Sequence, residues 1–311
     1  MSVSVIIATH SRPHLLPEAV ESARNAGTDV EAIVVDDAST DATAEVCSKL
    51  EGIKYIRLDR NQGVAGARNV GILASTGEFI TFHDDDDLRF PGSLDRQTEL
   101  LKRHPDAGMA YAQVIIGDEN CIPTEVIEPK QLQSGDLFWE LLSGYFIPYL
   151  SVVFRRECLY RVGLLQGGAR GYDDWDLWVR IAELYPVLAA DEPVGIWRSS
   201  TPGSGQGSSS RADHLGGVVE HQLKLFTLPR AAAAPASKRS EARRRLLNWT
   251  SDLLIWDAAT WLPRGWKEHA RHGLLTALRI HPTRAFRLWT LGLLLQSVLP
   301  DFRSTKTGDP A

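Results

Sequence analysis

The chain has 311 residues, of which 43% are hydrophobic and 23% charged, which suits one large α/β domain with an appended region. The amino terminus shows no charged start followed by an apolar core, so we expect no secretory signal. The cysteines Cys47, Cys121 and Cys158 lack the spacing of a metal site and cannot all pair. They indicate free thiols in a reducing, cytoplasmic setting.

The overall net charge of −5 hides an asymmetry along the chain. Residues 1–210 carry 18 Lys and Arg against 31 Asp and Glu, whereas residues 211–311 carry 16 against 8. The basic second part predicts contact with an anionic surface, and we favour the inner face of a membrane, bound peripherally through basic helices. Nucleic acid is excluded as a partner, because no binding motif appears and the acidic part would repel a phosphate backbone.

The first 116 residues alternate strand and helix patterns with short connections. Apolar runs predict five strands, Val3–Thr9, Val30–Val35, Ile53–Leu58, Glu78–His83 and Gly108–Ile116. Pro13 is expected to open the first helix, Ser39-Thr40-Asp41 to cap the second, and residues 64–75 to form the third. This alternation predicts an α/β fold, with a mostly parallel, Rossmann-like sheet and helices on both faces.

The alternation of strand and helix patterns ends after Ile116. Residues 117–135 are expected to be a loop, 136–144 a short helix and 147–155 a strand of the same sheet. Tyr172–Leu184 is predicted helical, and strands are expected around Val187 and at Val194–Arg198. Ser199–Ser210 consists of Ser, Gly, Thr, Pro and Gln, which predicts a flexible loop, either a lid over a site or a linker.

We therefore expect two domains, residues 1–212 and a helical region over 213–311. The predicted helices of the second are 213–228, 238–261, 264–280 and 283–299. The last is strongly apolar, but crossing a bilayer takes about 20 apolar residues, so it is too short. It either lies in a membrane interface, with Trp289 at the headgroups, or packs on the rest of the tail.

Four consecutive aspartates, Asp84 to Asp87, follow the predicted strand Glu78–His83. Like charges this close repel one another unless a positive group joins them. A divalent cation such as Mg²⁺ or Mn²⁺ is a natural candidate, since hard cations prefer oxygen ligands. A solvated acidic turn is the alternative, but open α/β sheets bind ligands at the carboxyl ends of their strands, which favours a site here.

The other strand ends supply partners at the same edge of the sheet. The first strand ends in Ala8 and Thr9 and is followed by Arg12, and the second ends in Asp36-Asp37. The connection over residues 61–69 contains glycines that let a backbone approach a ligand and then opens a helix whose amino terminus favours anions. Arg68 on that helix could reach a phosphate.

Five segments together resemble the family 2 glycosyltransferases with the nucleotide-diphospho-sugar (GT-A) fold. They lie at residues 4–9, 34–41, 61–69, 77–87 and 173–178, in the family's order. The resemblance covers roughly residues 3–200 and does not extend to the tail. It implies an inverting transfer of a sugar from a nucleotide-diphosphate donor, with a UDP-sugar favoured, to a hydroxyl of a glycan or lipid-linked acceptor. The implied setting is the synthesis of surface polysaccharide or glycoconjugate.

The resemblance also implies roles for individual residues. Those implied to bind the donor are Ala8, Thr9, Arg12, Asp36, Asp37, Arg68, Asp84 and Asp85. Among them, Asp36 would contact the base, and Asp84 or Asp85 the ribose or the metal. Asp86 resembles the direct metal ligand, with Asp84 as the second, and Asp87 has an alternative role as a helix cap before Leu88. The metal and Arg68 would stabilise the charge on the departing diphosphate.

The family's acidic pair falls on Asp173 and Asp174, and we choose Asp174 as the base that deprotonates the acceptor. Asp173 stands where it could cap a helix, and Asp176 could pair with Arg180 four residues on. Trp175 and Trp178 could offer a stacking face to an acceptor or belong to the core, and the core is favoured for Trp178.

One position departs from the family's pattern. Members often carry a histidine metal contact after the strand that matches Val194–Arg198, whereas here the next histidine is His214. Water, a serine or His214 could complete the metal shell. Two alternative functions remain open, a nucleotidyltransferase of related fold and a non-catalytic module that binds nucleotide sugars or glycans.

Overall fold

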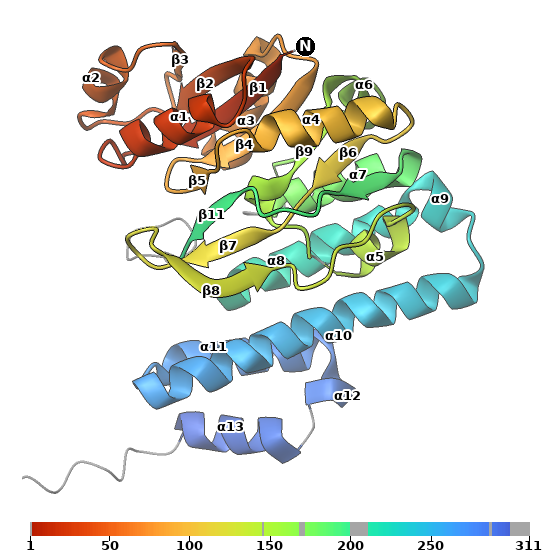
Figure 1. The fold of residues 1–311 in the computed structure, drawn as a ribbon. Helices are drawn as coiled ribbons and strands as arrows, with labels where there is room; N and C mark the ends of the chain where they lie inside the picture. Colours follow the sequence, from red (N-terminus) through yellow and green to blue (C-terminus); the bar gives the residue numbers. More distant parts are fainter. Residues whose placement is uncertain (1, 145, 168–171, 200–210, 286–287, 299–311) are drawn as a thin grey trace, which may run out of the picture.

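The computed structural model describes residues 2–144, 146–167, 172–199, 211–285 and 288–298, without the side chains of 211–214, 284–285 and 288–289. An α/β part carries two sheets, and a helical part follows it, with the long helix α10 running along the lower side of the α/β part in Figure 1.

The larger sheet has seven strands in the order β10-β6-β9-β4-β1-β2-β3. Their bounds are β1 Val3–Thr9, β2 Val30–Asp36, β3 Ile53–Arg57, β4 Phe79–Asp84, β6 Met109–Tyr111, β9 Val153–Arg155 and β10 Val187–Ala189. Only β9 runs antiparallel to its neighbours, β4 and β6. The predicted α/β class and mostly parallel sheet are therefore confirmed, and the carboxyl ends of β1, β2 and β4 share one edge.

Helices cover both faces of this sheet because its strands are apolar on both sides. Ile6 and Ile7, successive residues of β1, point to opposite faces and belong to different core clusters. The first cluster contains residues of α3, α5 and α7, and the second contains residues of α1 and α4. The bounds of these helices and of their short neighbours are α1 Leu16–Asn25, α2 Thr43–Ser48, α3 Gly63–Ala74, α4 Ser93–Arg103, α5 Phe138–Ser143, α6 Leu159–Val162 and α7 Asp173–Leu184.

A smaller sheet, absent from the predicted topology, packs beside the first. Its order is β5-β11-β7-β8, with β5 Leu88–Arg89, β7 Val114–Gly117, β8 Pro123–Glu128 and β11 Gly195–Arg198. The single strand expected over 108–116 is wrong, since β6 and β7 belong to different sheets. The loop expected over 117–135 is also wrong, because it contains β8, an exposed edge strand without a long apolar run.

Two further boundaries differ from the prediction. The first helix begins at Leu16 with Pro17 in its first turn, so Pro13 does not open it. The strand expected over 147–155 shortens to β9, because Tyr149–Ser151 form a turn of 3₁₀ helix before it.

The tail is helical, as predicted. Its helices are α8 Arg211–Lys224, α9 Pro229–Ala232, α10 Ala236–Trp261, α11 Lys267–Ile280, α12 Pro282–Ala285 and α13 Leu288–Val298. Of the helix expected over 283–299, residues 286–287 and 299 lie outside the described part, and the described residues belong to α12 and α13. Within the described residues, no helix combines the length and the apolar character that crossing a bilayer requires.

The first helices of the tail pack directly on α7. Val218 of α8 and Leu246 of α10 belong to the same core cluster as Trp175. His221 Nε2 lies 3.0 Å from Asp176 Oδ1, and the ring of Trp249 lies 5.3 Å from that of Trp175. The hydrophobic core therefore continues past residue 212. A separate cluster around Leu254 and Leu274 holds α10 and α11 together.

Candidate active site

The ends of β1 and β4 are joined by side chains. Thr9 Oγ1 donates to Asp85 Oδ2 at 2.6 Å. Arg12 Nη2 lies 2.5 Å from Asp85 Oδ1, and Arg12 Nη1 lies 2.6 Å from Asp86 Oδ2. Ser11 and Ala38, which follow β1 and β2, both have positive φ angles of 55° and 61°. Non-glycine residues in this conformation are strained and gather at functional sites, which supports a site at this edge.

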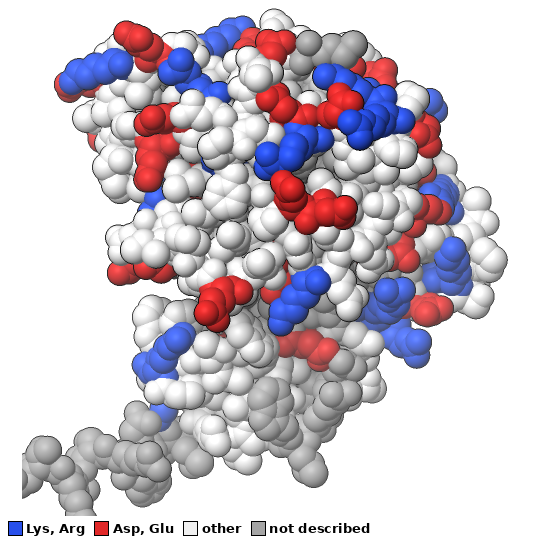
Figure 2. Space-filling view, viewed as in Figure 1, with Lys and Arg blue, Asp and Glu red and all other residues white. Residues whose placement is uncertain are grey.

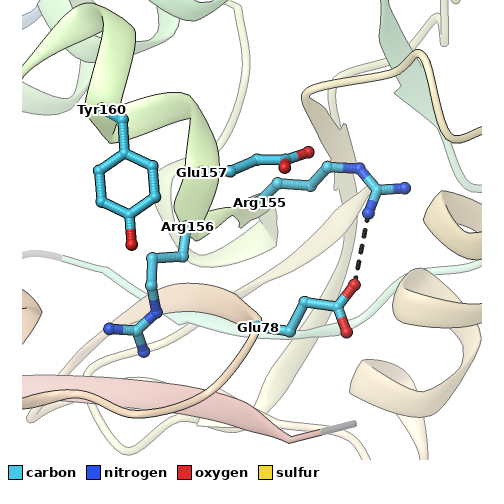
Figure 3. Close-up of a pocket in the computed structure, with 5 residues that line it drawn as sticks. All are labelled: Glu78, Arg155, Arg156, Glu157 and Tyr160. Atoms are coloured by element: carbon cyan, nitrogen blue, oxygen red, sulfur yellow. Dashed lines mark ion pairs between the residues drawn. The ribbon is translucent and has the colours of Figure 1, made fainter.

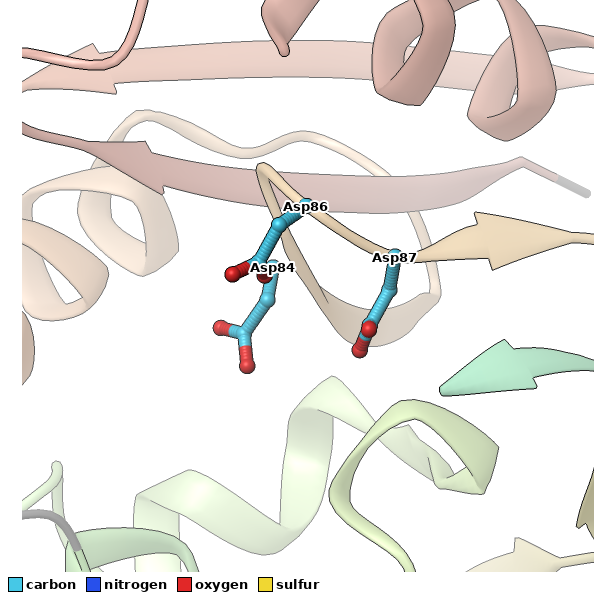
Figure 4. A group of neighbouring side chains, drawn as sticks. All are labelled: Asp84, Asp86 and Asp87. Atoms are coloured by element: carbon cyan, nitrogen blue, oxygen red, sulfur yellow. The ribbon is translucent and has the colours of Figure 1, made fainter. Parts of the chain in front are cut away.

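Three of the four consecutive aspartates lie close together (Figure 4). Asp84, Asp86 and Asp87 each offer a carboxylate oxygen, and these oxygens lie within 4.8 Å of one another. Burial raises the pKa of Asp84, although the positive charge of Arg68 acts to lower it. Burial, followed by the charges of Asp84 and Asp86, raises the pKa of Asp87 well above its usual range. A set of crowded oxygen ligands whose ionised forms need a positive partner fits Mg²⁺ or Mn²⁺.

Asp87 does not cap a helix. It is followed by strand β5, and its Oδ1 accepts a hydrogen bond from the backbone N–H of Arg198 at 2.9 Å. Arg198 also donates through Nε to the carbonyl oxygen of Asp86 at 2.6 Å. The sequence did not single out Arg198, which holds the acidic turn from β11, because nothing in the local sequence marks which distant turn the end of β11 contacts.

Arg68 connects the acidic turn to helix α7. Its Nη2 lies 2.8 Å from Asp84 Oδ1 and its Nη1 lies 3.2 Å from Asp173 Oδ2, while its guanidinium stacks 4.0 Å over the ring of Tyr149. Burial acts to lower the pKa of Arg68, but Tyr149, Asp173, Asp84 and Asp174 outweigh it and raise the pKa. The structure thus brings Arg68 to carboxylates, and its contact with a phosphate stays a prediction.

The acidic pair lies at the start of α7. Asp173 is the first residue of the helix and Tyr172 holds the cap position, so the expected capping role of Asp173 is wrong. Asp173 Oδ1 has no hydrogen-bond partner among the described residues. Asp174 follows it in the first turn and is 3% exposed. Asp176 pairs with Arg180, as predicted.

The two tryptophans of α7 belong to the core. Trp175 and Trp178 are fully buried, and Trp175 Nε1 donates to the carbonyl oxygen of Leu141 at 2.6 Å. Neither ring offers a stacking face to a ligand. The side chain of His214 and residues 200–210 lie outside the described part of the chain, so the alternatives for completing the metal shell and for a lid stay predictions.

The aspartates after β2 have partners within the protein. Asp36 is fully buried, and its two oxygens accept from Ser39 N–H at 2.8 Å and from Tyr55 Oη at 2.7 Å. Asp37 Oδ1 accepts from Gln62 N–H at 2.7 Å. These bonds tie the ends of β2 and β3 to the start of α3. Contact of Asp36 with a base stays a prediction.

An open pocket of about 200 Å³ lies at the opposite, amino end of β4. It is lined by Glu78, Arg155, Arg156, Glu157 and Tyr160, and Arg155 Nη1 lies 3.6 Å from Glu78 Oε1 (Figure 3). Its two arginines are balanced by two glutamates. Since ligands of such sheets bind at the carboxyl ends of the strands, this pocket is separate from the site at Asp84.

Comparison with known proteins agrees with this geometry. An "Uncharacterized glycosyltransferase" from Haemophilus influenzae is 24% identical over 185 residues, which are 58% of this chain and 62% of the relative, so the chain spans less than two thirds of that protein. The "Succinoglycan biosynthesis protein ExoO" from Rhizobium meliloti is 28% identical over 274 residues, 78% of this chain and 74% of the relative.

Two solved structures share the fold. Staphylococcus aureus TarS (residues 1–349) in complex with UDP-GlcNAc superposes with a TM-score of 0.62 at 16% identity, over 94% of this chain and 89% of that one. Mannosyltransferase PcManGT from Pyrobaculum calidifontis, in complex with GDP-Man and Mn²⁺, gives 0.56 at 20% identity, over 89% and 86%. Residues 4–163, just over half of the chain, match the family described as "Glycosyl transferase family 2". The chain therefore belongs to glycosyl transferase family 2, with the GT-A fold.

Proposed function

We propose that the protein transfers a sugar from a nucleotide-diphosphate donor to an acceptor hydroxyl with inversion at the anomeric carbon. One observation carries the proposal. Arg68 joins Asp84 of the acidic turn to Asp173 of the acidic pair, so both groups belong to one site. The complexes of TarS with UDP-GlcNAc and of PcManGT with GDP-Man support a nucleotide-sugar donor, and we favour a UDP-sugar.

Asp84, Asp86 and Asp87 would hold Mg²⁺ or Mn²⁺, and the Mn²⁺ in the PcManGT complex supports this choice. When bound, such a cation offsets the negative charge of the diphosphate that leaves. We place the nucleoside at the ends of β1 and β2, where Ala8, Thr9, Asp36 and Asp37 lie. Arg12, whose side chain is 25% exposed, and Asp85 complete the donor side.

Asp174 is the proposed general base. It takes the proton of the acceptor hydroxyl, whose oxygen attacks the anomeric carbon from the side opposite the diphosphate. The new carbon–oxygen bond forms as the bond to the phosphate oxygen breaks, and the electron pair of that bond leaves with the diphosphate. Arg68 holds Asp173, and with it the start of α7, at a set position relative to Asp84.

The test is incubation of the protein with Mn²⁺ and a panel of UDP-, GDP- and dTDP-sugars. Release of nucleoside diphosphate supports the proposal. Release of pyrophosphate would indicate nucleotidyl transfer instead, and donor binding without either product would indicate a binding module. Asp86→Ala and Asp174→Asn are expected to slow release strongly, and variants that match the parent rate would refute the assigned site.

The proposed setting is the assembly of surface polysaccharide or glycoconjugate at the inner face of a membrane, with a glycan or lipid-linked acceptor. The name of the relative ExoO supports the pathway class. On the face shown in Figure 2, basic and acidic side chains are interspersed. Arg243, Arg244 and Arg245 of α10 are exposed, and no described ion pair involves them, which suits anionic headgroups.

Sedimentation with vesicles that contain phosphatidylglycerol tests this attachment. Replacement of the three α10 arginines by glutamine is expected to reduce binding. The matched control replaces exposed cations of the α/β part, Lys102→Gln, Lys130→Gln and Arg161→Gln, and is expected to bind like the parent. Equal binding by all three proteins would refute attachment through α10.

A further inference from the structure

Trp197 is a tryptophan at the carboxyl end of β11 that the proposed reaction does not use. Its side chain is 38% exposed, whereas Trp175 and Trp178 are fully buried. It precedes Arg198, whose backbone N–H binds Asp87 and whose Nε binds the carbonyl oxygen of Asp86. An exposed aromatic ring therefore lies one residue from the contacts that hold the acidic turn.

The pairing of β11 with β5 shows which way this ring faces. The register of this antiparallel pair is Gly195↔Arg89 and Ile196↔Leu88. Trp197 lies two residues beyond Gly195 in β11, so its side chain points to the same side of the sheet as Gly195 and Arg89. Residues directly opposite each other in an antiparallel pair point to the same side. Arg89, opposite Gly195, donates through Nη2 to Thr81 Oγ1 of β4 at 2.8 Å. The side chain of Trp197 therefore lies on the face of the small sheet that is turned to β4, the strand that ends at Asp84.

The residues next to Trp197 on this face, toward the start of β11, are covered. Side chains alternate along β11, so Trp197 shares a face with Gly195, where an added Cβ would lie 3.0 Å from Leu150 Cδ2. On the neighbouring strands of the same face, Arg89 and Val114 are buried. Trp197 is the last position of the row, and there the face opens to solvent beside the acidic turn.

We propose that Trp197 is the platform on which the ring of an acceptor sugar stacks. This inference rests on the proposed glycosyl transfer. A tryptophan face offers flat apolar area, which suits the C–H face of a pyranose while the hydroxyl groups of the sugar point to the polar surroundings. An acceptor must approach the anomeric carbon, and the diphosphate attached to that carbon is proposed to lie at Asp84, Asp86 and Asp87.

The position of Trp197 favours the acceptor over the nucleobase. The base is proposed to lie over β1 and β2, which follow β4 on one side in the large sheet. Trp197 belongs to the small sheet and reaches the acidic turn through β5. Thr9 and Arg12 contact the acidic turn from the end of β1, whereas Arg198 contacts it from β11, so the turn connects the proposed base site to the strand that carries Trp197.

The experiment compares Trp197→Ala, Trp197→Tyr and a matched control, Trp256→Ala, which removes a 60% exposed tryptophan on α10. Acceptor KM is measured with a panel of p-nitrophenyl and methyl pyranosides. Donor-side binding is measured as the affinity for UDP with Mn²⁺, and the melting temperature reports folding. We expect Trp197→Ala to raise the acceptor KM about tenfold, Trp197→Tyr to restore most of it and Trp256→Ala to change nothing.

Two results would overturn the inference. One is an unchanged acceptor KM in Trp197→Ala. The other is a loss of UDP affinity as large as the rise in the acceptor KM, which would assign the ring to the donor site. Failure of the proposed function gives a different result, since the parent protein would then release no nucleoside diphosphate. In that case saturation-transfer NMR with the same pyranosides tests whether a sugar stacks on Trp197. Sugar signals must appear with the parent protein and weaken in Trp197→Ala.

Discussion

The guanidinium of Arg68 lies 3.2 Å from the carboxylate of Asp173, and this contact connects α3 to the first residue of α7. The same guanidinium lies 2.8 Å from Asp84 at the end of β4. Three segments far apart in the chain therefore meet at one buried positive charge. Because an isolated buried carboxylate is costly, the arginine stabilises both acids and sets the distance between the acidic turn and the acidic pair.

Removal of this charge should destabilise the protein. Arg68→Ala leaves Asp84 and Asp173 without their shared partner, and breaking a buried ion pair typically costs about 3–5 kcal/mol. Arg68→Lys should recover only part of the loss, since an ammonium cannot bridge two carboxylates as a planar guanidinium does. Urea unfolding measures the free energy, with the exposed Arg161→Ala as control. A loss for Arg68→Ala no larger than that of the control would contradict this role.

The three clustered aspartates, Asp84, Asp86 and Asp87, should act together in metal binding. Asp86→Asn and Asp87→Asn each remove one anionic oxygen ligand and should weaken Mn²⁺ binding at least about tenfold. Asp106→Asn, a substitution of an exposed aspartate after α4, should leave the affinity unchanged. Titration followed by electron paramagnetic resonance measures free Mn²⁺ directly. If Asp87→Asn binds Mn²⁺ like the parent, Asp87 only anchors β11 through Arg198.

Substitutions of two aspartates of α7, Asp174 and Asp176, should have different effects. Asp174→Asn should lower kcat about 10²–10⁴-fold while the melting temperature and UDP affinity stay close to the parent values, because it removes a proton acceptor. Asp176→Asn should instead lower the melting temperature, because Asp176 is fully buried and pairs with Arg180 and His221. Turnover assays and calorimetry separate the two. The base would need reassignment if Asp174→Asn retained full turnover.

The cysteines should resist alkylation in the folded protein. Burial raises the pKa of Cys47 to about 11, that of Cys121 to about 11 and that of Cys158 to about 12. At pH 8 all three are then neutral thiols, and the thiolate is the reactive form. Iodoacetamide should label them slowly in buffer and completely in urea, as read by mass spectrometry. Rapid labelling of one cysteine in buffer would show that its surroundings open.

Some features were predictable from the sequence because their causes are local. The apolar runs of β1, β2 and β4 reveal strands buried on both faces, and the acidic run that follows β4 must then lie at their common edge. The pairing of Asp176 with Arg180 follows from helical spacing alone. The exposed strand β8 escaped prediction because its stability comes from pairing with β7 rather than from an apolar run.

The amino-acid sequence by itself determined the α/β class, the family and the edge of the sheet where the carboxylates gather, since these follow from hydrophobic periodicity and from motifs within short segments. Only the tertiary structure decided that Asp87 lies close to Asp84 and Asp86, that Arg68 joins two acids and that Trp197, rather than Trp175, is exposed near them. Those relationships depend on how separate sheets and helices pack, because burial and partner choice are set by contacts between residues distant in the chain.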